Sequence, residues 1–582
     1  MDMINMKING MDVQVPANYT ILQAAEQAGI RIPTLCYLKD VNAIGACRLC
    51  VVEVKGARSN PVACLQTVAE GMEVQTNTAA IRESRKKTLE LLLSNHRMDC
   101  LGCSRSTNCE LQTLAQEYEC DNHKYQFGGE LEPDIDDSAI HLIRDNSKCI
   151  LCRRCVAVCK FNQHASVIGP NARGFKTHIA SAFEMGLAET SCVNCGQCIA
   201  VCPTGALTER DDTAKVWAAL NDPTKHVVVG PAPSVRVQLG ECFGMPIGTN
   251  VEGKMIAALK RLGFDKVFDV DTAADLTIME EGTEFIGRLT NGGKLPMITS
   301  CSPGWIKFCE HYYPEFTENL STCKSPQGMF GAMVKSYYAE KAGIDPKDIV
   351  TVSIMPCTAK KFELSREEMQ NKDGLRDIDV SLTTRELASM IKRAGIKFTE
   401  LPDETADPVF GIASGAGHIF GATGGVMEAA LRTVVEKVTG KPLEKLEFNE
   451  VRGLKDIKEA EYDVAGIKVR VAVTSGLENA AKLLDMVKNG ERDYHFIEVM
   501  ACPGGCVNGG GQPHQPGYVR NNMDLRAVRA AGLYGEDEAM TLRKSHENPV
   551  MKELYEYLGE PNGHKSHELL HTHYTKRGLY NK

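Results

Sequence analysis

Long apolar runs and an export signal are both missing from this sequence of 582 residues. No stretch of about 18 apolar residues occurs, which argues against a membrane-spanning helix. The first residues, MDMINMKINGMDVQV, have neither the basic start nor the apolar core of a secretion signal. Basic residues are fewer than acidic ones, 66 against 75. The resulting net charge of −9 disfavours nucleic acid or an anionic membrane as a partner. We therefore expect a cytoplasmic protein.

Cysteine is the residue that the sequence has in excess, with 23 copies. A disulfide framework is typical of small secreted chains, whereas this chain is long and shows no export signal. The count is odd, and most of the cysteines stand in clusters. Metal ligation is the interpretation that fits this pattern.

The first 80 residues indicate a small β-rich module. Asn9-Gly10, between two strand-like segments, is a type I′ hairpin signal, and a helix is expected from Thr20 to about Gly29. Residues 81–125 indicate helices and a cysteine-containing loop. Residues 139–210 contain two short cysteine blocks about 43 positions apart, and the charged segment 211–225 is expected to be a linker.

From residue 225 the sequence alternates between strand-like and helical segments. The candidate strands are HVVVGPA, KVFDV, LPMITS, IVTVSIM, VRVAVTS and HFIEVM. This alternation predicts an α/β region of two lobes with mainly parallel sheets. Cys301, Cys357 and Cys502 each follow a candidate strand, at the sheet edge where cofactors bind, so they could converge. Residues 521–582 are expected to form a helical belt around this region.

The two cysteine blocks predict a pair of 4Fe–4S clusters. Each block has the spacing C-x2-C-x2-C-x3-C, and the second ends in Cys-Pro. In such a pair the fourth cysteine of each block ligates the other cluster, whereas zinc would need only two isolated C-x2-C pairs. The first cluster is therefore assigned to Cys149, Cys152, Cys155 and Cys202. The second cluster is assigned to Cys159, Cys192, Cys195 and Cys198.

Two further groups of ligands lie nearer the N-terminus. A C-x10-C-x2-C-x13-C pattern suits a 2Fe–2S cluster, with zinc as the alternative; its members are Cys36, Cys47, Cys50 and Cys64. An H-x3-C-x2-C-x5-C pattern suits a 4Fe–4S cluster with one histidine ligand, although zinc fits this spacing too; its members are His96, Cys100, Cys103 and Cys109. Four clusters in series would make a wire that delivers electrons.

Three long segments in the second half carry a family resemblance. They are TSCSPGW (299–305), MPCTAKKFE (355–363) and EVMACPGGCVNGGGQPH (498–514). These segments resemble the three signature motifs of the iron-only (FeFe) hydrogenases, and the resemblance extends over essentially the whole chain. The layout also resembles the cluster-rich catalytic subunit of multisubunit, NAD(P)-linked or electron-bifurcating hydrogenases.

The resemblance implies a β-grasp 2Fe–2S ferredoxin-like domain (1–80), a small His/Cys cluster module (81–125) and a bacterial-ferredoxin-like domain with two 4Fe–4S clusters (139–210). A catalytic domain (225–520) and a belt that resembles a small subunit (521–582) follow. The reaction implied is 2H⁺ + 2e⁻ ⇌ H₂.

The resemblance also implies an H-cluster, a cubane bridged to a two-iron unit with CO, cyanide and a dithiolate amine. Cys357 and Cys502 match ligands of the cubane, and Cys506 matches the bridging ligand. Lys360 would donate to an iron-bound cyanide, which would compensate its buried charge. Ser234 would bond the other cyanide. The residues expected around the cluster are Ala232, Pro233, Gln327, Met355, Phe420, Gly421 and Met500.

One position departs from the family pattern. The first motif usually carries two adjacent cysteines, the first relaying protons and the second ligating the cubane, but here the pair is Cys301-Ser302. Ser302 could ligate through oxygen, Cys301 could take over ligation, or the cubane could have another fourth ligand. Sulfur is the softer donor, yet the register favours Cys301 as the relay.

The resemblance further implies a proton relay from Cys301 through Glu281, Ser321 and Glu284 towards Arg288. Glu281 and Glu284 are three positions apart and share one face if the stretch is helical. A solvated helix face is the ordinary reading of such a pair, and only the motif match favours the relay.

Ferredoxin and an NAD(P)-linked flavoprotein subunit are both plausible electron partners in a hetero-oligomer, and maturation proteins would assemble the cluster. No nucleotide fingerprint is visible: the stretch SGAGHIFGATGG (414–425) lacks the Gly-Lys-Ser/Thr ending of a phosphate loop. The alternatives are a hydrogenase-like sensor or assembly protein and a non-catalytic iron–sulfur electron-transfer subunit. Either should lack Lys360 or the glutamate relay, and this chain retains both.

Overall fold

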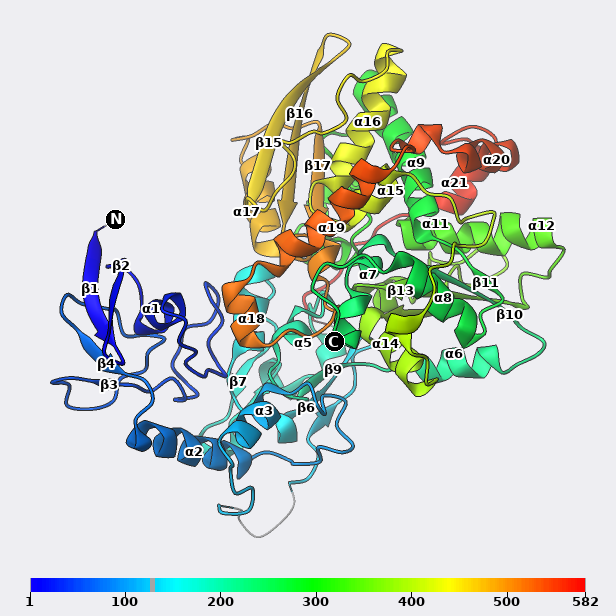
Figure 1. Ribbon diagram of the computed structural model, residues 1–582. Helices are drawn as coiled ribbons and strands as arrows, with labels where there is room; N and C mark the ends of the chain where they lie inside the picture. Colours follow the sequence, from blue (N-terminus) through cyan, green and yellow to red (C-terminus); the bar gives the residue numbers. More distant parts are fainter. Residues whose placement is uncertain (1, 126–130, 581–582) are drawn as a thin grey trace.

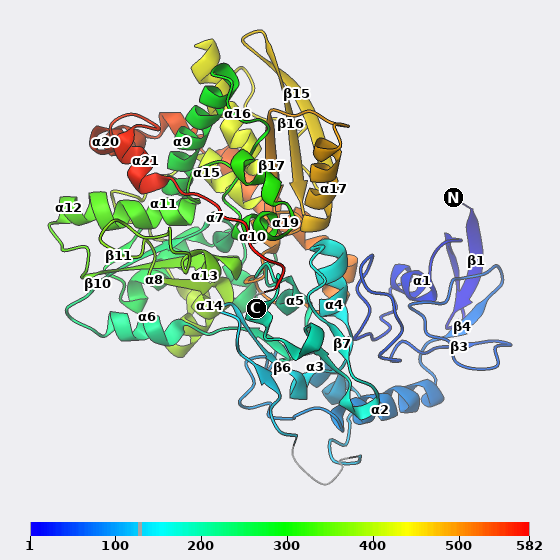
Figure 2. The same ribbon diagram turned by 180° about the vertical axis from the view of Figure 1, so that it is seen from behind.

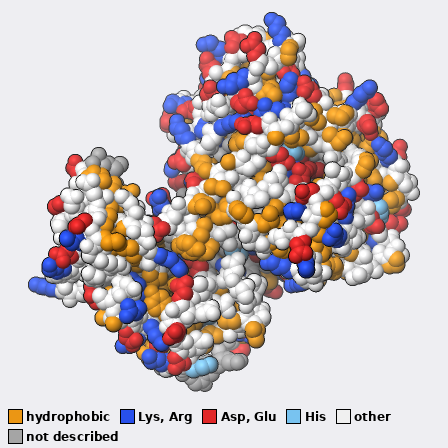
Figure 3. Space-filling model, viewed as in Figure 1, with side chains coloured by type: hydrophobic (Ala, Val, Ile, Leu, Met, Phe, Trp, Pro, Cys, Tyr) orange, Lys and Arg blue, Asp and Glu red, His pale blue; other side chains and the backbone are white. Residues whose placement is uncertain are grey.

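The chain forms a β module, two helices, a cysteine-rich segment and a large α/β unit, in that order (Figure 1). The structure is a computed structural model that describes residues 2–125 and 131–580. The β module stands out to one side of the molecule in both views (Figures 1 and 2). A groove of about 1770 Å³ runs between it and the rest of the chain (Figure 3).

The β module is a four-stranded sheet with one helix. Its strands are β1 (Met3–Ile8), β2 (Met11–Pro16), β3 (Glu53–Val54) and β4 (Glu73–Gln75), in the order β2-β1-β4-β3. Asn9 and Gly10 have φ of 52° and 85°, as a type I′ turn requires, so the hairpin prediction is confirmed. Helix α1 (Ile21–Gln27) begins at a capping box made by Thr20 and Gln23.

Two helices connect the β module to the cysteine-rich segment. They are α2 (Ala79–Leu93) and α3 (Glu110–Glu117). Arg85 on α2 is buried, and its guanidinium donates to the backbone oxygens of Leu49 and Val51 at 3.0 and 2.9 Å. These bonds fix α2 against the loop that carries Cys50.

The cysteine-rich segment is built on short elements. Strands β5 (Ile135–Asp136), β6 (Leu142–Asp145) and β9 (Leu207–Glu209) form one sheet, and β7 (Gly169–Asn171) pairs with β8 (His178–Ala180). Helix α4 (Arg154–Ala157) follows the first cysteine loop, and α5 (Gln197–Val201) follows the second. The internal repeat of the sequence is thus a repeat of loop followed by helix.

The α/β unit contains two four-stranded sheets. In the first, β11 (Lys266–Val267), β10 (His226–Pro231), β13 (Ile349–Met355) and β14 (Val380–Thr383) are all parallel. In the second, β12 (Met297–Ile298), β17 (Phe496–Met500) and β16 (Ile467–Ser475) are parallel, whereas β15 (Ile457–Val464) is antiparallel to β16. Strands β14 and β15 were not among the predicted strands, because β15 alternates polar and apolar residues at an edge and β14 is short.

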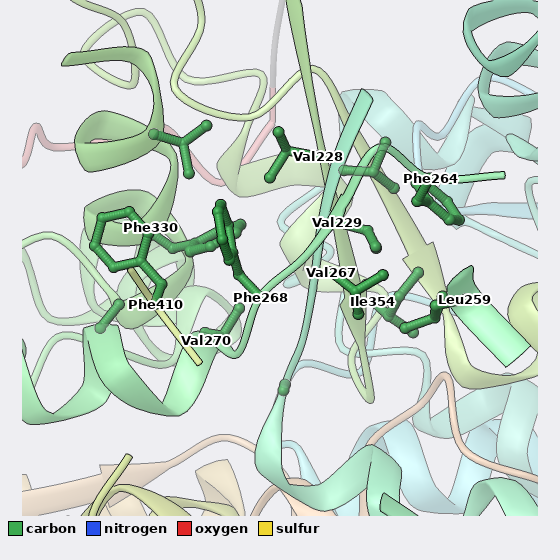
Figure 4. Close-up of a cluster of buried hydrophobic side chains, with 14 of the residues drawn as sticks. Val228, Val229, Leu259, Phe264, Val267, Phe268, Val270, Phe330, Ile354 and Phe410 are labelled. Carbon is green, nitrogen blue, oxygen red and sulfur yellow. The ribbon is translucent and has the colours of Figure 1, made fainter. Parts of the chain in front are cut away.

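Helices pack around and between the two sheets (Figure 1). The helices of this unit are α7 (Pro233–Arg236), α8 (Glu252–Leu262), α9 (Val270–Thr290), α10 (Pro303–Tyr312), α11 (Pro326–Met333), α12 (Ala339–Ala342), α13 (Ala359–Glu363), α14 (Thr384–Arg393), α15 (Gly415–His418), α16 (Gly425–Thr439) and α17 (Leu477–Lys488). The core of the first sheet consists of β-branched strand residues such as Val228 and Val229 with the rings of Phe268, Phe330 and Phe410 (Figure 4). Burial of these side chains fixes the strand ends that carry the cysteines.

The predicted linker at 211–225 is wrong in part. Residues Thr213–Leu220 form helix α6, whose Val216 is fully buried. Asp212 accepts a 2.6 Å hydrogen bond from the ammonium of Lys361 in the α/β unit. The charged sequence looked solvated, but its carboxylate is matched by a buried cation.

The last part of the chain returns across the α/β unit. It contains α18 (Gly517–Asn522), α19 (Leu525–Ala539), α20 (Pro549–Leu558) and α21 (His564–Leu570). Asn522 donates to Glu26 of the β module at 2.6 Å, and Asn521 accepts from the Lys39 backbone at 2.8 Å. The tail therefore contacts the N-terminal β module as well as the α/β unit, where Tyr555 donates to Glu280 at 2.6 Å. Within the described residues, no helix is long and apolar enough to cross a membrane.

Candidate functional site

A cavity lies where the two sheets meet, beyond the ends of β12, β13 and β17. Cys301, Cys357 and Cys502, which follow these strands, all line it, and so does Cys506. The structure therefore brings together the late cysteines that the sequence singled out. The four thiols are not paired in disulfides, and burial raises the pKa of each. Buried thiols that are not in disulfides suit a soft metal centre, which stabilises their deprotonated form.

The rest of the wall is mainly apolar. Seven further residues expected around the cluster or at the proposed ligand position line the cavity: Ala232, Pro233, Ser234, Gln327, Met355, Phe420 and Met500. Gly421 is the exception, because it lies behind Ser234. A Cβ at Gly421 would stand 2.5 Å from Leu533 and 3.1 Å from the Ser234 Cβ, so this glycine lets the wall close rather than approaching the cavity itself.

Lys360 lines the cavity with its charge already compensated. Its ammonium donates to Glu363 at 2.9 Å, to the Ser325 hydroxyl at 2.7 Å and to the Cys301 backbone oxygen at 3.1 Å. The sequence reasoning expected the anionic partner to be a cyanide, but within the protein it is Glu363. Glu363 and Ser325 were missed, although the i, i+3 spacing of Lys360 and Glu363 on one helix was a usable signal.

The side chains of Cys301 and Ser302 have different neighbours in the cavity. Burial and the nearby Glu281 carboxylate raise the pKa of Cys301, so this thiol faces the titratable side of the site. The Ser302 hydroxyl accepts a 3.2 Å hydrogen bond from the Ala501 backbone, directly before Cys502. Both residues line the cavity, and Ser302 lies on the side of Cys502.

A row of polar groups connects Cys301 to the surface. Burial raises the pKa of Glu281 to about 8, and Ser321 hydrogen-bonds this carboxyl. The Ser321 hydroxyl donates to Glu284 at 3.1 Å, and Arg288 donates to Glu284 at 2.6 Å. Helix α9 does carry both glutamates, and the structure brings the relay residues together in the expected order. One carboxylate oxygen of Glu281 is buried without a hydrogen-bond partner among the described residues.

Two cavities in the cysteine-rich segment match the crosswise assignment of its thiols. One, of about 410 Å³, is lined by Cys149, Cys152, Cys155 and Cys202. The other, of about 510 Å³, is lined by Cys159, Cys192, Cys195 and Cys198. Burial raises the pKa of Cys149 to about 11 and of Cys152 to about 12. In both cavities the donor set fits a cluster of iron and sulfide.

The second of these cavities adjoins the large one. A side-chain hydrogen bond links Gln197 to Cys502 and counteracts the effect of burial on the pKa of that thiol. The Gln197 amide also donates to the Asn508 backbone oxygen at 2.7 Å. One residue of the cysteine-rich segment thus contacts both the thiol and the loop that line the α/β cavity.

The four N-terminal cysteines are all buried and come together in two pairs. A hydrogen bond from Cys36 lowers the pKa of Cys47 to about 6, and Cys64 likewise lowers the pKa of Cys50. The Asn42 side chain donates to the Cys36 backbone oxygen at 2.8 Å and to that of Cys152 at 3.1 Å. This group therefore lies beside the first cavity of the cysteine-rich segment.

His96 and its three cysteines approach the same cavity from another side. Burial lowers the pKa of His96 to about 4, and its Nδ1 has no hydrogen-bond partner in the described structure. Cys109 donates to the Pro203 backbone oxygen at 3.6 Å, next to Cys202. A neutral imidazole with an unpartnered nitrogen suits a metal ligand.

The order of the four groups is branched rather than serial. The N-terminal group meets the first cavity through Cys152, and the His96 group meets it through Pro203. The sequence alone had suggested four stations in series, whereas these contacts place both outer groups beside the first cavity. Spacing within each motif could not show this, because the branch depends on contacts between residues more than 90 positions apart.

Comparisons with known proteins give the same picture over nearly the whole chain. Residues 225–510 match the iron only hydrogenase large subunit, C-terminal domain, and residues 523–577 match the iron hydrogenase small subunit. Residues 1–79 match a 2Fe–2S iron–sulfur cluster binding domain, residues 85–124 the NADH-ubiquinone oxidoreductase-G iron–sulfur binding region, and residues 148–206 a 4Fe–4S dicluster domain.

Named relatives match at full length. The chain is 49% identical to the NADP-reducing hydrogenase subunit HndD of Solidesulfovibrio fructosivorans, covering 99% of this chain and 100% of that protein. It is 46% identical to iron hydrogenase 1 of Clostridium pasteurianum, covering 98% and 99%. A solved structure of the [FeFe]-hydrogenase HydA1 from Chlamydomonas reinhardtii matches 63% of this chain and 99% of its own, with a TM-score of 0.57 and 47% identity. The chain thus belongs to the iron-only (FeFe) hydrogenases, which are oxidoreductases that act on H₂.

Proposed function

We propose that this hydrogenase catalyses 2H⁺ + 2e⁻ ⇌ H₂ in the cavity between the two sheets, with electrons relayed through one 2Fe–2S and three 4Fe–4S clusters. The main support for the proposal is that Cys357, Cys502 and Cys506 line one apolar cavity. This cavity adjoins the second thiol-lined cavity on one side and a row of buried carboxyls on another. Electrons and protons therefore have separate routes to one place.

In this proposal Cys357, Cys502 and Cys506 hold the H-cluster, which supplies the redox-active iron at which protons and electrons combine. Lys360 presents a cation to the anionic ligands of that group while Glu363 and Ser325 hold its ammonium in place. Ser234 offers a hydroxyl on the opposite wall. The apolar side chains of Met355, Phe420 and Met500 exclude water from the cavity. We propose Ser302 as the fourth protein contact of the cubane, with Cys301 or another ligand as the alternatives.

Protons are proposed to move along the row that ends at Arg288. The thiol of Cys301 exchanges a proton with the carboxyl of Glu281, whose raised pKa keeps it near the balance between its two forms at neutral pH. Ser321 connects this carboxyl to Glu284. Glu284 and Arg288 are partly exposed and deliver the proton to water. Because Arg288 stays charged, its role is to orient Glu284 rather than to carry the proton.

Electrons are proposed to enter at either of two outer clusters. One is held by Cys36, Cys47, Cys50 and Cys64, and the other by His96, Cys100, Cys103 and Cys109. Both meet the cluster of Cys149, Cys152, Cys155 and Cys202. The cluster of Cys159, Cys192, Cys195 and Cys198 follows, and Gln197 and Cys502 join it to the cavity. A branched entry suits a chain that exchanges electrons with more than one partner.

The partners proposed are ferredoxin, an NAD(P)-linked flavoprotein subunit, or both, in a hetero-oligomer assembled with maturation proteins. The name of the relative from Solidesulfovibrio fructosivorans, an NADP-reducing hydrogenase subunit, supports the second partner. The domain limits proposed are 1–80, 81–125, 139–210, 225–520 and 521–582, with α6 between the third and fourth. A cytoplasmic location, without nucleic-acid or membrane partners, is proposed with them.

Infrared spectroscopy of the anaerobically matured protein tests the proposal. We expect bands from iron-bound CO and cyanide together with H₂ evolution from a reduced dye. The absence of these bands after maturation would sink the catalytic assignment. Bands without turnover would favour the alternative, a hydrogenase-like sensor or electron-transfer subunit. The intact row from Cys301 to Arg288 argues for the enzyme.

A further inference from the structure

Lys307 is a buried lysine that neither route above uses. It lies on α10, the helix that begins directly after Ser302, and only 8% of the residue is exposed. Its ammonium donates a 2.6 Å hydrogen bond to the side-chain oxygen of Asn194 and lies 4.4 Å from the centre of the Phe362 ring. A buried ammonium is costly, so its place between two domains calls for a reason.

Asn194 stands in the chain between Cys192 and Cys195, two thiols that line the second cavity of the cysteine-rich segment. Its amide nitrogen hydrogen-bonds Nδ1 of His141 at 2.7 Å, and His141 Nε2 lies 4.0 Å from the Cys192 sulfur. Its backbone oxygen accepts a 2.8 Å hydrogen bond from Thr358, which follows Cys357. Asn194 therefore ties the loop of the second cluster to Lys307 on one side and to the catalytic loop on the other.

The ammonium of Lys307 is bonded to a neutral amide of the cysteine loop rather than to a carboxylate. Among the ion pairs of the described residues, none includes Lys307, since its direct partner is a neutral amide. Glu310 on the same helix is engaged by Arg366 at 2.7 Å and by Arg577.

A positive charge inside a low-dielectric region stabilises an added electron nearby. The interaction is strong because burial removes the screening that water gives to surface charges. Cluster charge and hydrogen bonds to the sulfurs are recognised determinants of iron–sulfur potentials. Lys307 supplies the charge, and its bond to Asn194 holds the loop that carries two of the thiols.

We propose that Lys307 is a positioning residue that raises the reduction potential of the cluster held by Cys159, Cys192, Cys195 and Cys198. This inference rests on the proposed electron route and deepens it. A higher potential at this station holds an electron beside the catalytic cavity, so it favours the removal of electrons during H₂ oxidation. Lys307 therefore helps to set the catalytic bias of the enzyme without touching the reacting atoms.

The test uses the full, matured protein and two substitutions at this position. Lys307→Met removes the charge and the hydrogen bond, whereas Lys307→Arg keeps a cation. In a redox titration followed by EPR, we expect one 4Fe–4S signal to shift to lower potential in Lys307→Met and to stay near its original potential in Lys307→Arg. The 2Fe–2S signal and the signal of the His96 cluster should not move. Lys176→Met, which removes an exposed lysine of the same segment, is the matched control.

Catalytic bias gives a second readout. The ratio of H₂ oxidation to H₂ evolution should fall in Lys307→Met and recover in Lys307→Arg. Unchanged potentials in a fully loaded Lys307→Met protein would overturn the proposal, and so would equal shifts in both variants. If Lys307→Met loses the cluster, Lys307→Gln keeps a hydrogen-bond donor to Asn194 without the charge. Loss of the cluster in Lys307→Gln as well would show a structural role and refute the tuning.

The infrared bands separate this inference from the proposed function. If the bands are absent but the EPR signal still shifts, the catalytic assignment fails while the role of Lys307 stands. If the bands are present and no signal shifts, the inference about Lys307 fails alone.

Discussion

Gly196 and Gly510 meet backbone to backbone at the junction of the cysteine-rich segment and the α/β unit. A Cβ at Gly510 would stand 2.5 Å from the Gly196 Cα and 2.3 Å from the Cys195 backbone oxygen. A Cβ at Gly196 would stand 2.4 Å from the Thr358 hydroxyl. The two loops that carry Cys195 and Cys506 can approach each other only because these positions lack side chains.

Replacing Gly510 by alanine should force the two loops apart. Overpacking at a tight contact costs about 1–3 kcal/mol, so we expect a lower unfolding temperature. A longer distance between the loops that carry Cys195 and Cys506 should also slow electron transfer between the two sites. We expect slower reoxidation of the pre-reduced 4Fe–4S clusters by protons, which a stopped-flow experiment measures. Gly535→Ala is the control, since no atom lies within 4 Å of its added Cβ. If both variants showed the same unfolding temperature and the same reoxidation rate, the close contact between the two loops would not matter for electron transfer.

Replacing Glu281 by glutamine should stop proton delivery while leaving the cluster in place. The amide keeps the shape of the side chain but cannot exchange a proton, and a positioned acid or base contributes about 10²–10⁴-fold to a rate. We expect H₂ evolution to fall by about that factor. The infrared bands of CO and cyanide should persist. Turnover is measured with a reduced dye in excess.

Thr283→Ala is the matched control for Glu281. Thr283 lies on the same helix, and its hydroxyl donates to the Met279 backbone oxygen at 2.7 Å, away from the relay. Loss of the Thr283 hydroxyl should leave turnover within about twofold of wild type, because substitutions away from buried networks usually have small effects. Full activity in Glu281→Gln would remove this carboxyl from the proton route.

The protonation of Glu281 should depend on pH in a defined direction. Burial raises its pKa from 4.5 to about 8, so the neutral acid persists below about pH 8. The bound proton stabilises the folded protein most at pH values below 4.5, and this contribution is lost as the pH rises through 8. An infrared band of a neutral carboxyl should therefore disappear above pH 8 and be absent from Glu281→Gln at every pH.

Much of this site could be predicted from local sequence, and the remainder depends on distant contacts. Cys301 and Cys502 follow neighbouring parallel strands, β12 and β17, so their approach follows from the rule that parallel strands end at one edge. Cys357 follows β13 of the other sheet, so its convergence with them depends on how the two sheets meet. Glu363 was missed because it looked like an ordinary helix carboxylate until Lys360 was seen to be buried beside it. Asn42 and Pro203 bring both outer ligand groups beside one cavity through bonds between residues more than 90 positions apart, and the spacing within a motif does not encode such contacts.

Replacing His96 by cysteine should lower the potential of one cluster. A thiolate carries a negative charge that neutral imidazole lacks, and added charge disfavours reduction. We expect a single EPR signal to shift downwards in a redox titration, whereas His96→Ala should weaken or abolish that signal. His178→Ala changes a half-buried histidine paired with Glu184 and should shift no signal. An unchanged set of signals in His96→Ala would mean that this histidine is structural.

Ser302 stands where the resemblance led us to expect a ligating cysteine, and the role of its oxygen can be tested directly. In the protein its hydroxyl accepts a hydrogen bond from the Ala501 backbone at 3.2 Å, beside Cys502. If this oxygen also contacts the cubane, Ser302→Ala should alter the EPR signal and potential of the catalytic centre and leave the accessory signals unchanged. Ser302→Cys should keep the centre and shift its potential, since sulfur is the softer donor to iron.

Cys301→Ala should instead lower turnover with the cubane retained, because its thiol faces Glu281. Loss of the cubane in Cys301→Ala, with no change in Ser302→Ala, would assign the fourth contact to Cys301 and reverse the two roles.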